Sequence, residues 1–141
     1  MKLKTKVILF KIIEPKSKLL KIIQTSYHHF SRKEKLLIRC PDEMSMRFVD
    51  ELLWKEPKES FLPHIATLEK SNDFICITKS IENLNDARFL INLNPDFLDI
   101  DSDFKTIYDF DDNTTVVKKE KSQKRIDYYR SLNYQIELGS K

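Results

Sequence analysis

Glycine is nearly absent from this sequence of 141 residues, in which Gly139 is the single example. Loops that cradle a phosphate, and the fingerprints that bind dinucleotides, need several glycines so that the backbone can approach the anion closely. None of these motifs is possible here. The scarcity of glycine therefore excludes the usual ways in which an α/β chain binds a nucleotide, and we expect no cofactor.

Cysteine is also scarce, and the two cysteines, Cys40 and Cys76, do not make a disulfide framework. Each lies in or beside a short apolar run, which indicates a small buried thiol. No Cys-x-x-Cys is present, and the adjacent His28 and His29 point in different directions on a helix. We therefore expect no metal site.

Long hydrophobic runs are missing, since none approaches the roughly 20 residues that span a bilayer. The lysine-rich start followed by Val7 to Phe10 resembles the beginning of a secretory signal, but Lys11 interrupts the apolar run and no small-residue cleavage site follows. We expect a cytoplasmic protein with no membrane partner.

Strand-like and helix-like patterns alternate along the chain. Apolar runs typical of buried strands occupy 6–13, 35–40, 74–78, 89–93 and 105–110, and a short last strand is predicted at 134–138. Helical patterns occupy 16–31, 41–54 and 114–132. The sequence predicts an α/β fold, with one domain over residues 1–138 and a short tail at 139–141. Its mainly parallel sheet is flanked by helices, Rossmann-like but without nucleotide-binding loops.

Local signals mark the helices. Pro15 opens the first at a position that helices favour, and Asn113 or Thr114 is expected to cap the third. Ser122 is small enough to let the third helix lie close to the sheet. In the second helix we expect an inner stripe formed by Met44, Phe48, Val49, Leu52 and Leu53.

Charge is unevenly placed, although the net charge is only +3. Residues 96–112 carry seven aspartates and one lysine, whereas residues 118–125 carry five basic residues and one glutamate. Such asymmetry more often sets partner choice than nucleic-acid affinity. Lys118, Lys121 and Arg125 share one helical side, which is compatible with nucleic-acid phosphates, an acidic peptide or an ordinary solvated face.

The stretch from Asp50 to His64 holds the only tryptophan and two of the five prolines. Pro57 stops the preceding helix, and an extended segment follows. Large apolar side chains on a short rigid loop are how a protein presents anchors to a partner. The alternative is that the side chains of Trp54 and Phe61 are buried in the hydrophobic core beneath the loop. Composition alone leaves both interpretations open.

No side chains are arranged as in a catalytic site. Ser60 and His64 lie four residues apart in an extended loop and not in the strand–turn–helix setting of a nucleophile elbow. Asp101 and Asp103 lack the glycine and the closing glutamate of a calcium-binding loop. We expect no enzyme, and His64 is interpreted as a structural or interface hydrogen-bonding residue.

The central stretch reads Asp50-Glu51-x-Leu53-Trp54-x-x-Pro57-x-Glu59-Ser60-Phe61-x-Pro63-His64. Further motifs are Leu90-Ile91-Asn92-Leu93, Ile107-x-Asp109-Phe110 and Arg125-x-x-x-Tyr129-Arg130. Together they resemble the chi subunit of bacterial DNA polymerase III. The resemblance implies a non-enzymatic accessory subunit that links the clamp loader, through its psi subunit, to single-stranded DNA-binding protein and so contacts DNA indirectly. Some relatives bind a helicase of the XPD/DinG type through the surface used for psi.

The resemblance also implies two binding surfaces. The surface for psi or the helicase would comprise Trp54, Phe61, Leu62, Pro63 and His64. There, Trp54 is expected to orient the loop while Phe61 to His64 face the partner. The second surface would receive the acidic C-terminal tail of single-stranded DNA-binding protein, which ends in Phe. Its expected residues are Lys118, Lys119, Lys121, Lys124, Arg125 and Tyr128.

The tail surface departs from the family pattern. Lys119 matches a basic position, but Gln123, Ile126 and Asp127 stand where an arginine, an aromatic and a lysine are expected. Asn133 replaces a glycine before the last strand and is expected to adopt a left-handed cap. The alternative function is a module that binds single-stranded nucleic acid directly, with the basic helix along the phosphates.

Overall fold

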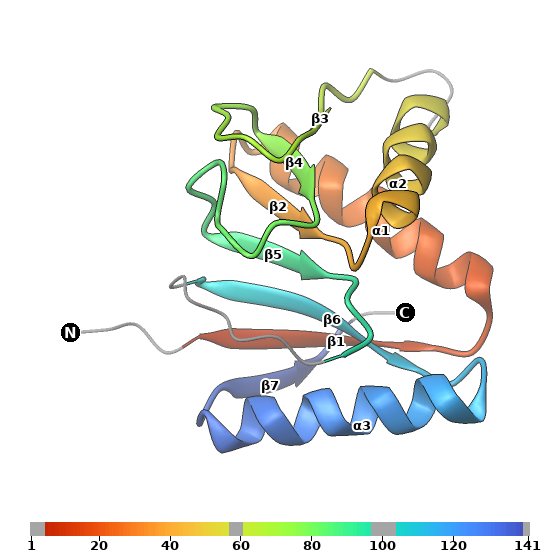
Figure 1. The fold of residues 1–141 in the computed structure, drawn as a ribbon. Coiled ribbons are helices and arrows are strands. Elements are labelled where there is room, and N and C mark those ends of the chain that lie inside the picture. Colours follow the sequence, from red (N-terminus) through yellow and green to blue (C-terminus); the bar gives the residue numbers. More distant parts are fainter. Residues whose placement is uncertain (1–4, 57–60, 97–103, 140–141) are drawn as a thin grey trace.

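The computed structural model describes residues 5–56, 61–96 and 104–139. Strands and helices alternate along the chain, as the sequence predicts (Figure 1). In order they are β1 (Lys6–Ile12), α1 (Pro15–Ser31), β2 (Leu36–Arg39), α2 (Glu43–Lys55), β3 (Ile65–Ala66), β4 (Ile75–Thr78), β5 (Phe89–Asn92), β6 (Thr106–Asp112), α3 (Val116–Ser131) and β7 (Gln135–Leu138). No helix within the described ranges is long and apolar enough to cross a membrane.

In the part of the chain that the structure describes, the strands form one seven-stranded sheet in the order β3-β4-β2-β5-β6-β1-β7. Every neighbouring pair of strands is parallel. The central strands β2 and β4 are buried at all four positions, which explains why they are apolar without alternation. The predicted α/β fold is confirmed.

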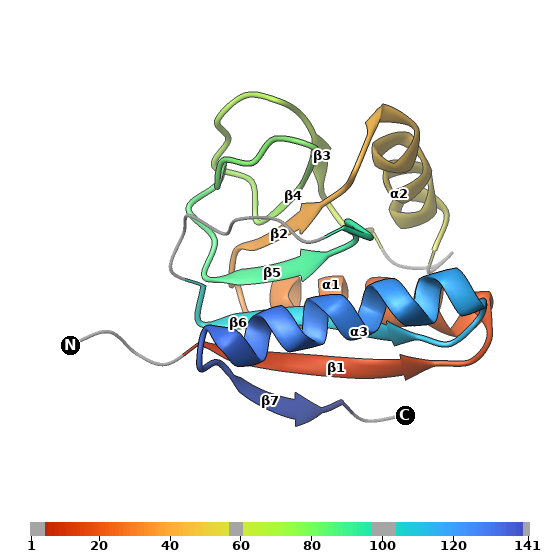
Figure 2. The ribbon, with the colours of Figure 1, turned by 60° about the horizontal axis from the view of Figure 1, so that its bottom comes forward.

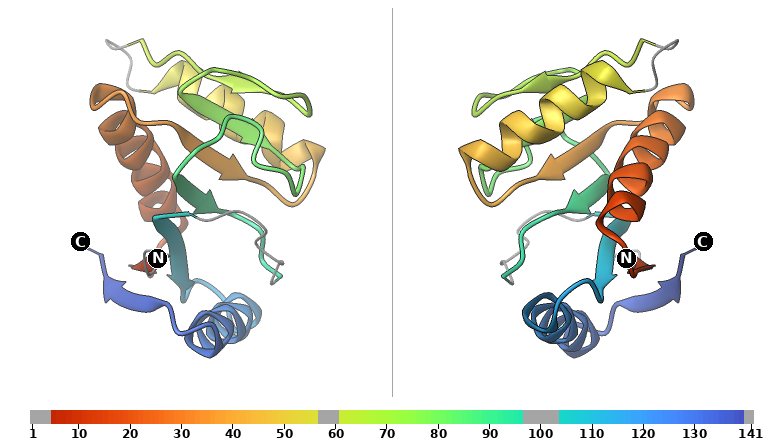
Figure 3. Two further views of the ribbon diagram at one scale, coloured as in Figure 1. Left: turned by 90° about the vertical axis from the view of Figure 1, so that its left-hand side faces the viewer. Right: turned by 90° about the vertical axis from the view of Figure 1, so that its right-hand side faces the viewer.

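The sheet separates two hydrophobic cores. Ile22 of α1 and Val49 and Leu53 of α2 pack on one face, whereas Ile126 and Tyr129 of α3 pack on the other. Figure 2 shows α3 in front of the sheet with α1 behind it, and both views of Figure 3 place α1 and α2 away from α3. Each helix follows a parallel strand, so all three begin at the same edge of the sheet, where the strands end.

The α3 cap lies one residue later than predicted. Thr115 caps the helix by accepting a hydrogen bond of 3.1 Å from the backbone N–H of Lys118. Thr114 is occupied elsewhere, because its hydroxyl donates to Asp112 Oδ1 at 2.6 Å. Asn113 donates through its side chain to the carbonyl of Asp111. The prediction that Ser122 brings α3 close to the sheet is confirmed, since its hydroxyl is fully buried and accepts from the backbone N–H of Asp112.

The predicted inner stripe of α2 is wrong for two residues. Met46, Val49 and Leu53 face the sheet, whereas Met44 is 81% exposed and Phe48 is 53% exposed. The stripe at positions 46, 49 and 53 follows the helical period equally well, and packing on the sheet selects it. Met44 and Phe48 are thereby turned toward the neighbouring α1 and toward solvent.

Among the described residues, three other than glycine adopt the left-handed conformation, namely Lys33, Asp86 and Asn133, with φ values of 57°, 53° and 60°. The left-handed cap expected at Asn133 is confirmed. Gly139 continues the pairing of β7 with β1, since its N–H donates to the Leu9 carbonyl at 2.7 Å. A Cβ atom at Gly139 would lie 2.4 Å from Cδ1 of Phe10, so the single glycine permits a close approach.

Candidate functional site

An exposed aromatic pair lies where α2 ends. Trp54 is 52% exposed in the last turn of the helix, and Phe61 is 68% exposed beyond it. Their ring centroids are 5.6 Å apart. Pro57 and Ser60 lie outside the described residues. The sequence leaves open whether Trp54 and Phe61 are surface anchors or core residues. Burial in the core is wrong for both, because both side chains are exposed to solvent.

His64 packs against Trp54 and fixes the loop that follows Phe61. Its Nδ1 lies 2.7 Å from the carbonyl oxygen of Leu62. Its Nε2 lies 3.0 Å from Oδ1 of Asp50 and 3.1 Å from the Asp50 carbonyl oxygen. The ring centroid is also 4.2 Å from that of Trp54. His64 thus ties the loop to α2, in agreement with its interpretation as a hydrogen-bonding residue.

The expectation that Phe61 to His64 all face outward needs correction. Leu62 is 1% exposed and joins the core beneath α2, and the side chain of His64 is fully buried. Pro63 is half-buried. The expected division of labour holds only in part, since Trp54 packs on the His64 ring and Phe61 is exposed, but His64 is the residue that ties the loop to α2. The exposed apolar surface of this stretch consists of Trp54 and Phe61 with part of Pro63.

The residues of α3 that were expected to bind the tail differ in their exposure to solvent. Lys118, Lys119 and Lys124 are exposed, whereas Lys121 is half-buried and its Nζ lies 3.2 Å from Asp96 Oδ1. Tyr128 is half-buried beside Tyr129. Arg125 is buried, so its expected place on an open surface is wrong.

Arg125 belongs to a buried polar network that joins α3 to β6 and to the segment after β5. Its Nε lies 3.3 Å from both carboxylate oxygens of Asp109, and its Nη1 donates to the carbonyl of Pro95 at 2.6 Å. Tyr129 donates to Asp109 Oδ2 at 2.6 Å, and Asn92 donates to the same oxygen at 3.2 Å. Burial, followed by the charge of Asp109, raises the pKa of Tyr129 well above its ordinary value.

This network gathers three of the sequence motifs. Asn92 comes from one motif, Asp109 from a second, and Arg125 and Tyr129 from a third, and they meet around the carboxylate of Asp109. A buried charge is tolerated when it is paired and hydrogen-bonded, as Asp109 is here. These motif residues therefore build the fold, and the exposed lysines carry the outward positive charge of α3.

Two of the three α3 positions that depart from the family pattern contact each other on the outer face of the helix. Gln123 donates to Asp127 Oδ1 at 3.0 Å, and Arg130 Nη1 lies 3.5 Å from the same oxygen. Ile126 is buried in the core with Tyr129. The carboxylate of Asp127 is therefore engaged by its own neighbours, and Ile126 is unavailable to a ligand on the outer face.

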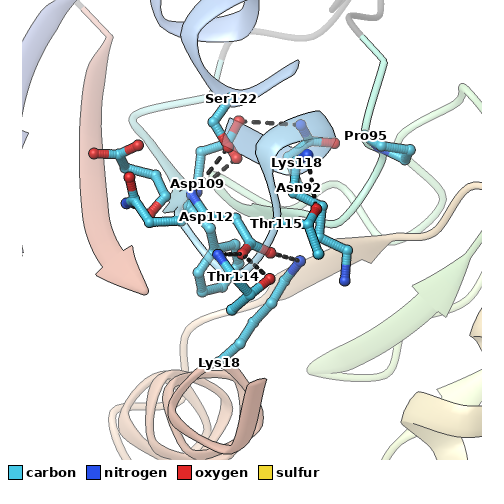
Figure 4. A network of polar contacts seen from close by, with 12 residues as sticks. Lys18, Asn92, Pro95, Asp109, Asp112, Thr114, Thr115, Lys118 and Ser122 are labelled. Carbon is cyan, nitrogen blue, oxygen red and sulfur yellow. Dashed lines mark hydrogen bonds and ion pairs between the residues drawn. The ribbon is translucent and has the colours of Figure 1, made fainter. Parts of the chain in front are cut away.

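One basic residue was missed by the sequence reasoning. Lys18 of α1 reaches Asp112 at the end of β6, with 3.5 Å between Nζ and Oδ2 (Figure 4). Burial lowers the pKa of Lys18, and the charge of Asp112 opposes that shift. Burial alone would raise the pKa of Asp112, but the hydrogen bonds from Thr114 and the charge of Lys18 lower it. Only the adjacency of β1 and β6 brings these groups together, and the sequence does not display that adjacency.

Within the described ranges, no group of three or more His, Cys, Asp or Glu side chains could hold a metal ion. Asp101 and Asp103 lie outside those ranges. A family model described as DNA polymerase III chi subunit, HolC, matches residues 6–137 of the chain. A comparison with curated proteins found no match.

Proposed function

As a member of the DNA polymerase III chi subunit family, the chain is an accessory subunit of that polymerase, and we propose that it acts as a non-catalytic cytoplasmic adaptor. It links the clamp loader, through a psi subunit, or a helicase of the XPD/DinG type to the C-terminal tail of single-stranded DNA-binding protein. Residues 1–138 act as one domain in this role. DNA is reached through these partners.

The exposed pair of Trp54 and Phe61 is the observation that carries the proposal. Two large aromatic side chains lie in contact at the surface, and the Trp54 ring packs on the buried His64. Burial of one such side chain in an interface contributes about 1.5–3 kcal/mol of apolar transfer free energy. Preorganised aromatic anchors of this kind are typical of the energetic centre of a protein–protein interface.

The test of this surface is capture of a purified psi subunit or XPD/DinG-type helicase by the Phe61→Ala variant. We expect the dissociation constant to rise about tenfold or more, because the lost apolar contact exceeds 1.4 kcal/mol. Leu20→Ala removes an exposed apolar side chain from α1 and serves as the control. Unchanged capture by a Phe61→Ala protein of normal helicity would exclude this surface.

Binding of the tail to α3 is tested with a labelled peptide that copies the acidic tail of single-stranded DNA-binding protein. Binding should weaken as salt is added, because the attraction to the lysines of α3 is screened. Removal of the terminal Phe should abolish it. A parallel titration with single-stranded DNA alone addresses the alternative function. Tight DNA binding without a partner protein would favour the direct nucleic-acid-binding module.

A further inference from the structure

The outer side of β7 is open to a further strand. β7 is the last strand in the sheet order, and Figure 2 shows it at the border of the sheet, next to β1. The backbone N–H groups of Gln135 and Gly139 donate toward β1, at 3.0 and 2.7 Å. Both backbone groups of a residue in a parallel strand point to one side, and that side alternates along the strand. The N–H and carbonyl groups of Ile136 and Leu138 therefore point outward, away from β1.

β7 lacks the features that usually protect the edge strand of a sheet. At the opposite edge, β3 has only two residues, and so short a strand offers little backbone to a partner. β7 has four residues and contains neither lysine nor proline. Its last residue, Leu138, is 86% exposed, the largest fraction of any large apolar side chain in the described ranges. An edge of this kind is a template for pairing with another chain.

The two faces of β7 differ in chemistry. Ile136 and Leu138 lie on the face that α3 covers, as does Tyr134 just before the strand. Gln135 and Glu137 lie on the opposite face, and Gln135 Nε2 donates to Glu137 Oε1 at 2.9 Å. The Glu137 carboxylate also lies 3.7 Å from the ammonium group at the start of β1, which balances its charge. β7 thus has one apolar face and one face that carries an amide and a carboxylate.

These residues complement a second copy of the same strand. If two β7 strands run antiparallel with Ile136 opposite its own counterpart, Leu138 lies opposite Tyr134. On the other face Glu137 lies opposite Gln135, so that an amide can donate to a carboxylate. Twofold symmetry makes each of these pairs occur twice. A shift by one residue in each strand would instead place Glu137 opposite Glu137, and like charges directly opposite are destabilising. The charge of Glu137 therefore selects the first register.

We propose that two copies of this chain pair through antiparallel β7 strands in this register, so that both sheets continue across a twofold axis. The outward N–H and carbonyl groups of the two Ile136 residues bond each other. Each exposed Leu138 side chain is covered by a Tyr134 ring. The aromatic pair at the end of α2 stays accessible, because α2 packs beside β3 and β4 at the opposite edge of the sheet. The dimer goes beyond the adaptor function and does not depend on it.

The register is tested by disulfide cross-linking of the full chain. Ile136→Cys is expected to form a covalent dimer on oxidation by dissolved oxygen, because hydrogen-bonded residues opposite each other in antiparallel strands have Cα atoms about 5.5 Å apart, within disulfide range. Leu138→Cys is the matched control. Position 138 is more exposed than position 136, so random collisions would favour it, but in this register its counterpart lies roughly 13 Å away along the strands. Cys40 and Cys76 are buried and do not compete.

Sedimentation analysis over roughly a hundredfold range of protein concentration tests the dimer without cross-linking, since its population follows mass action. Leu138→Asp is expected to raise the dissociation constant of the dimer about tenfold or more, because the apolar contact is lost. Leu68→Asp, at an exposed leucine after β3, is the control, and helicity establishes that each variant is folded. An unmodified protein that stays monomeric over the whole range overturns the proposal. Cross-linking of Leu138→Cys or Glu137→Cys as fast as that of Ile136→Cys overturns it as well.

Discussion

Arg125 and Asp109 form an ion pair inside the protein, with the arginine Nε 3.3 Å from both carboxylate oxygens. Removal of one partner leaves a buried charge without its counterion, which typically costs about 3–5 kcal/mol. Arg125→Met is therefore expected to lower the free energy of unfolding by an amount in that range, measured by urea denaturation. The sequence places Arg125 among the peptide-binding residues, and this variant separates the two roles.

Lys124→Met is the control for that experiment, because Lys124 is the exposed neighbour of Arg125. Its unfolding free energy should stay within about 0.5 kcal/mol of the unmodified protein, as is usual for surface substitutions. An Arg125→Met protein of unchanged stability that no longer binds the tail peptide would contradict the structural role of Arg125.

His64 is expected to control the position of Trp54 although it is itself buried. His64→Ala removes the hydrogen bonds to Leu62 and Asp50 and the ring contact with Trp54. We expect a loss of about 1–3 kcal/mol, the usual cost of leaving buried polar groups unpaired. The emission of the only tryptophan should also change. His28→Ala, at an exposed histidine, is the control and should change neither stability nor emission. If His64→Ala also leaves the unfolding free energy and the tryptophan emission unchanged, the loop is held by other contacts.

Lys33 is expected to be a site where glycine stabilises the protein. Its φ of 57° lies in the left-handed region, which costs a residue with a Cβ about 1–2 kcal/mol. Lys33→Gly should therefore raise the free energy of unfolding by up to about 1 kcal/mol, since the entropy of the unfolded chain offsets part of the gain. Lys35→Gly, just before β2, should be neutral or destabilising. Equal effects at both positions in thermal unfolding would contradict the prediction.

The two thiols are expected to be inert in the folded protein and to weaken it at alkaline pH. Burial raises the pKa of Cys40 from 9.0 to about 12 and that of Cys76 to about 11. The unfolded chain loses these protons near pH 9 while the folded chain keeps them. Stability is therefore complete below that pH and falls as the pH rises above it.

The measurement is urea denaturation between pH 8 and 10 in a Cys40→Ala/Cys76→Ala variant and in the unmodified protein. The variant should lose less stability over this interval. A disulfide-based thiol reagent should label neither cysteine in the native state and both in denaturant. Rapid native labelling would show that one of the strands β2 or β4 opens readily.

Much of the fold follows from local patterns in the sequence. The unbroken apolar runs of β2 and β4 predict strands covered on both faces, and Pro15 marks the start of α1 within one residue. The two-residue strand β3 was not predicted because it is too short to show a period. The α2 stripe was misassigned because two overlapping sets of apolar residues fit one helix, and only packing against the sheet decides between them.

The site was harder to predict than the fold. The central motif contains Trp54 and Phe61, which are exposed, but residue type alone does not tell which side chains of a loop face inward, and those of Leu62 and His64 do. Likewise Arg125 belongs to a basic run on the sequence, yet it points to Asp109, 16 positions away along the chain. The orientation of a charged residue depends on its spatial partner, which strand order creates.

The aromatic pair lies at the end of α2, whereas the exposed lysines lie on α3, on the other face of the sheet (Figure 3). If each of these faces holds one partner, the two partners do not compete for space, and the fraction of bridged complexes is the product of the two separate occupancies. The bridge then lasts only as long as the weaker of the two contacts, and either partner can leave without breaking the contact to the other.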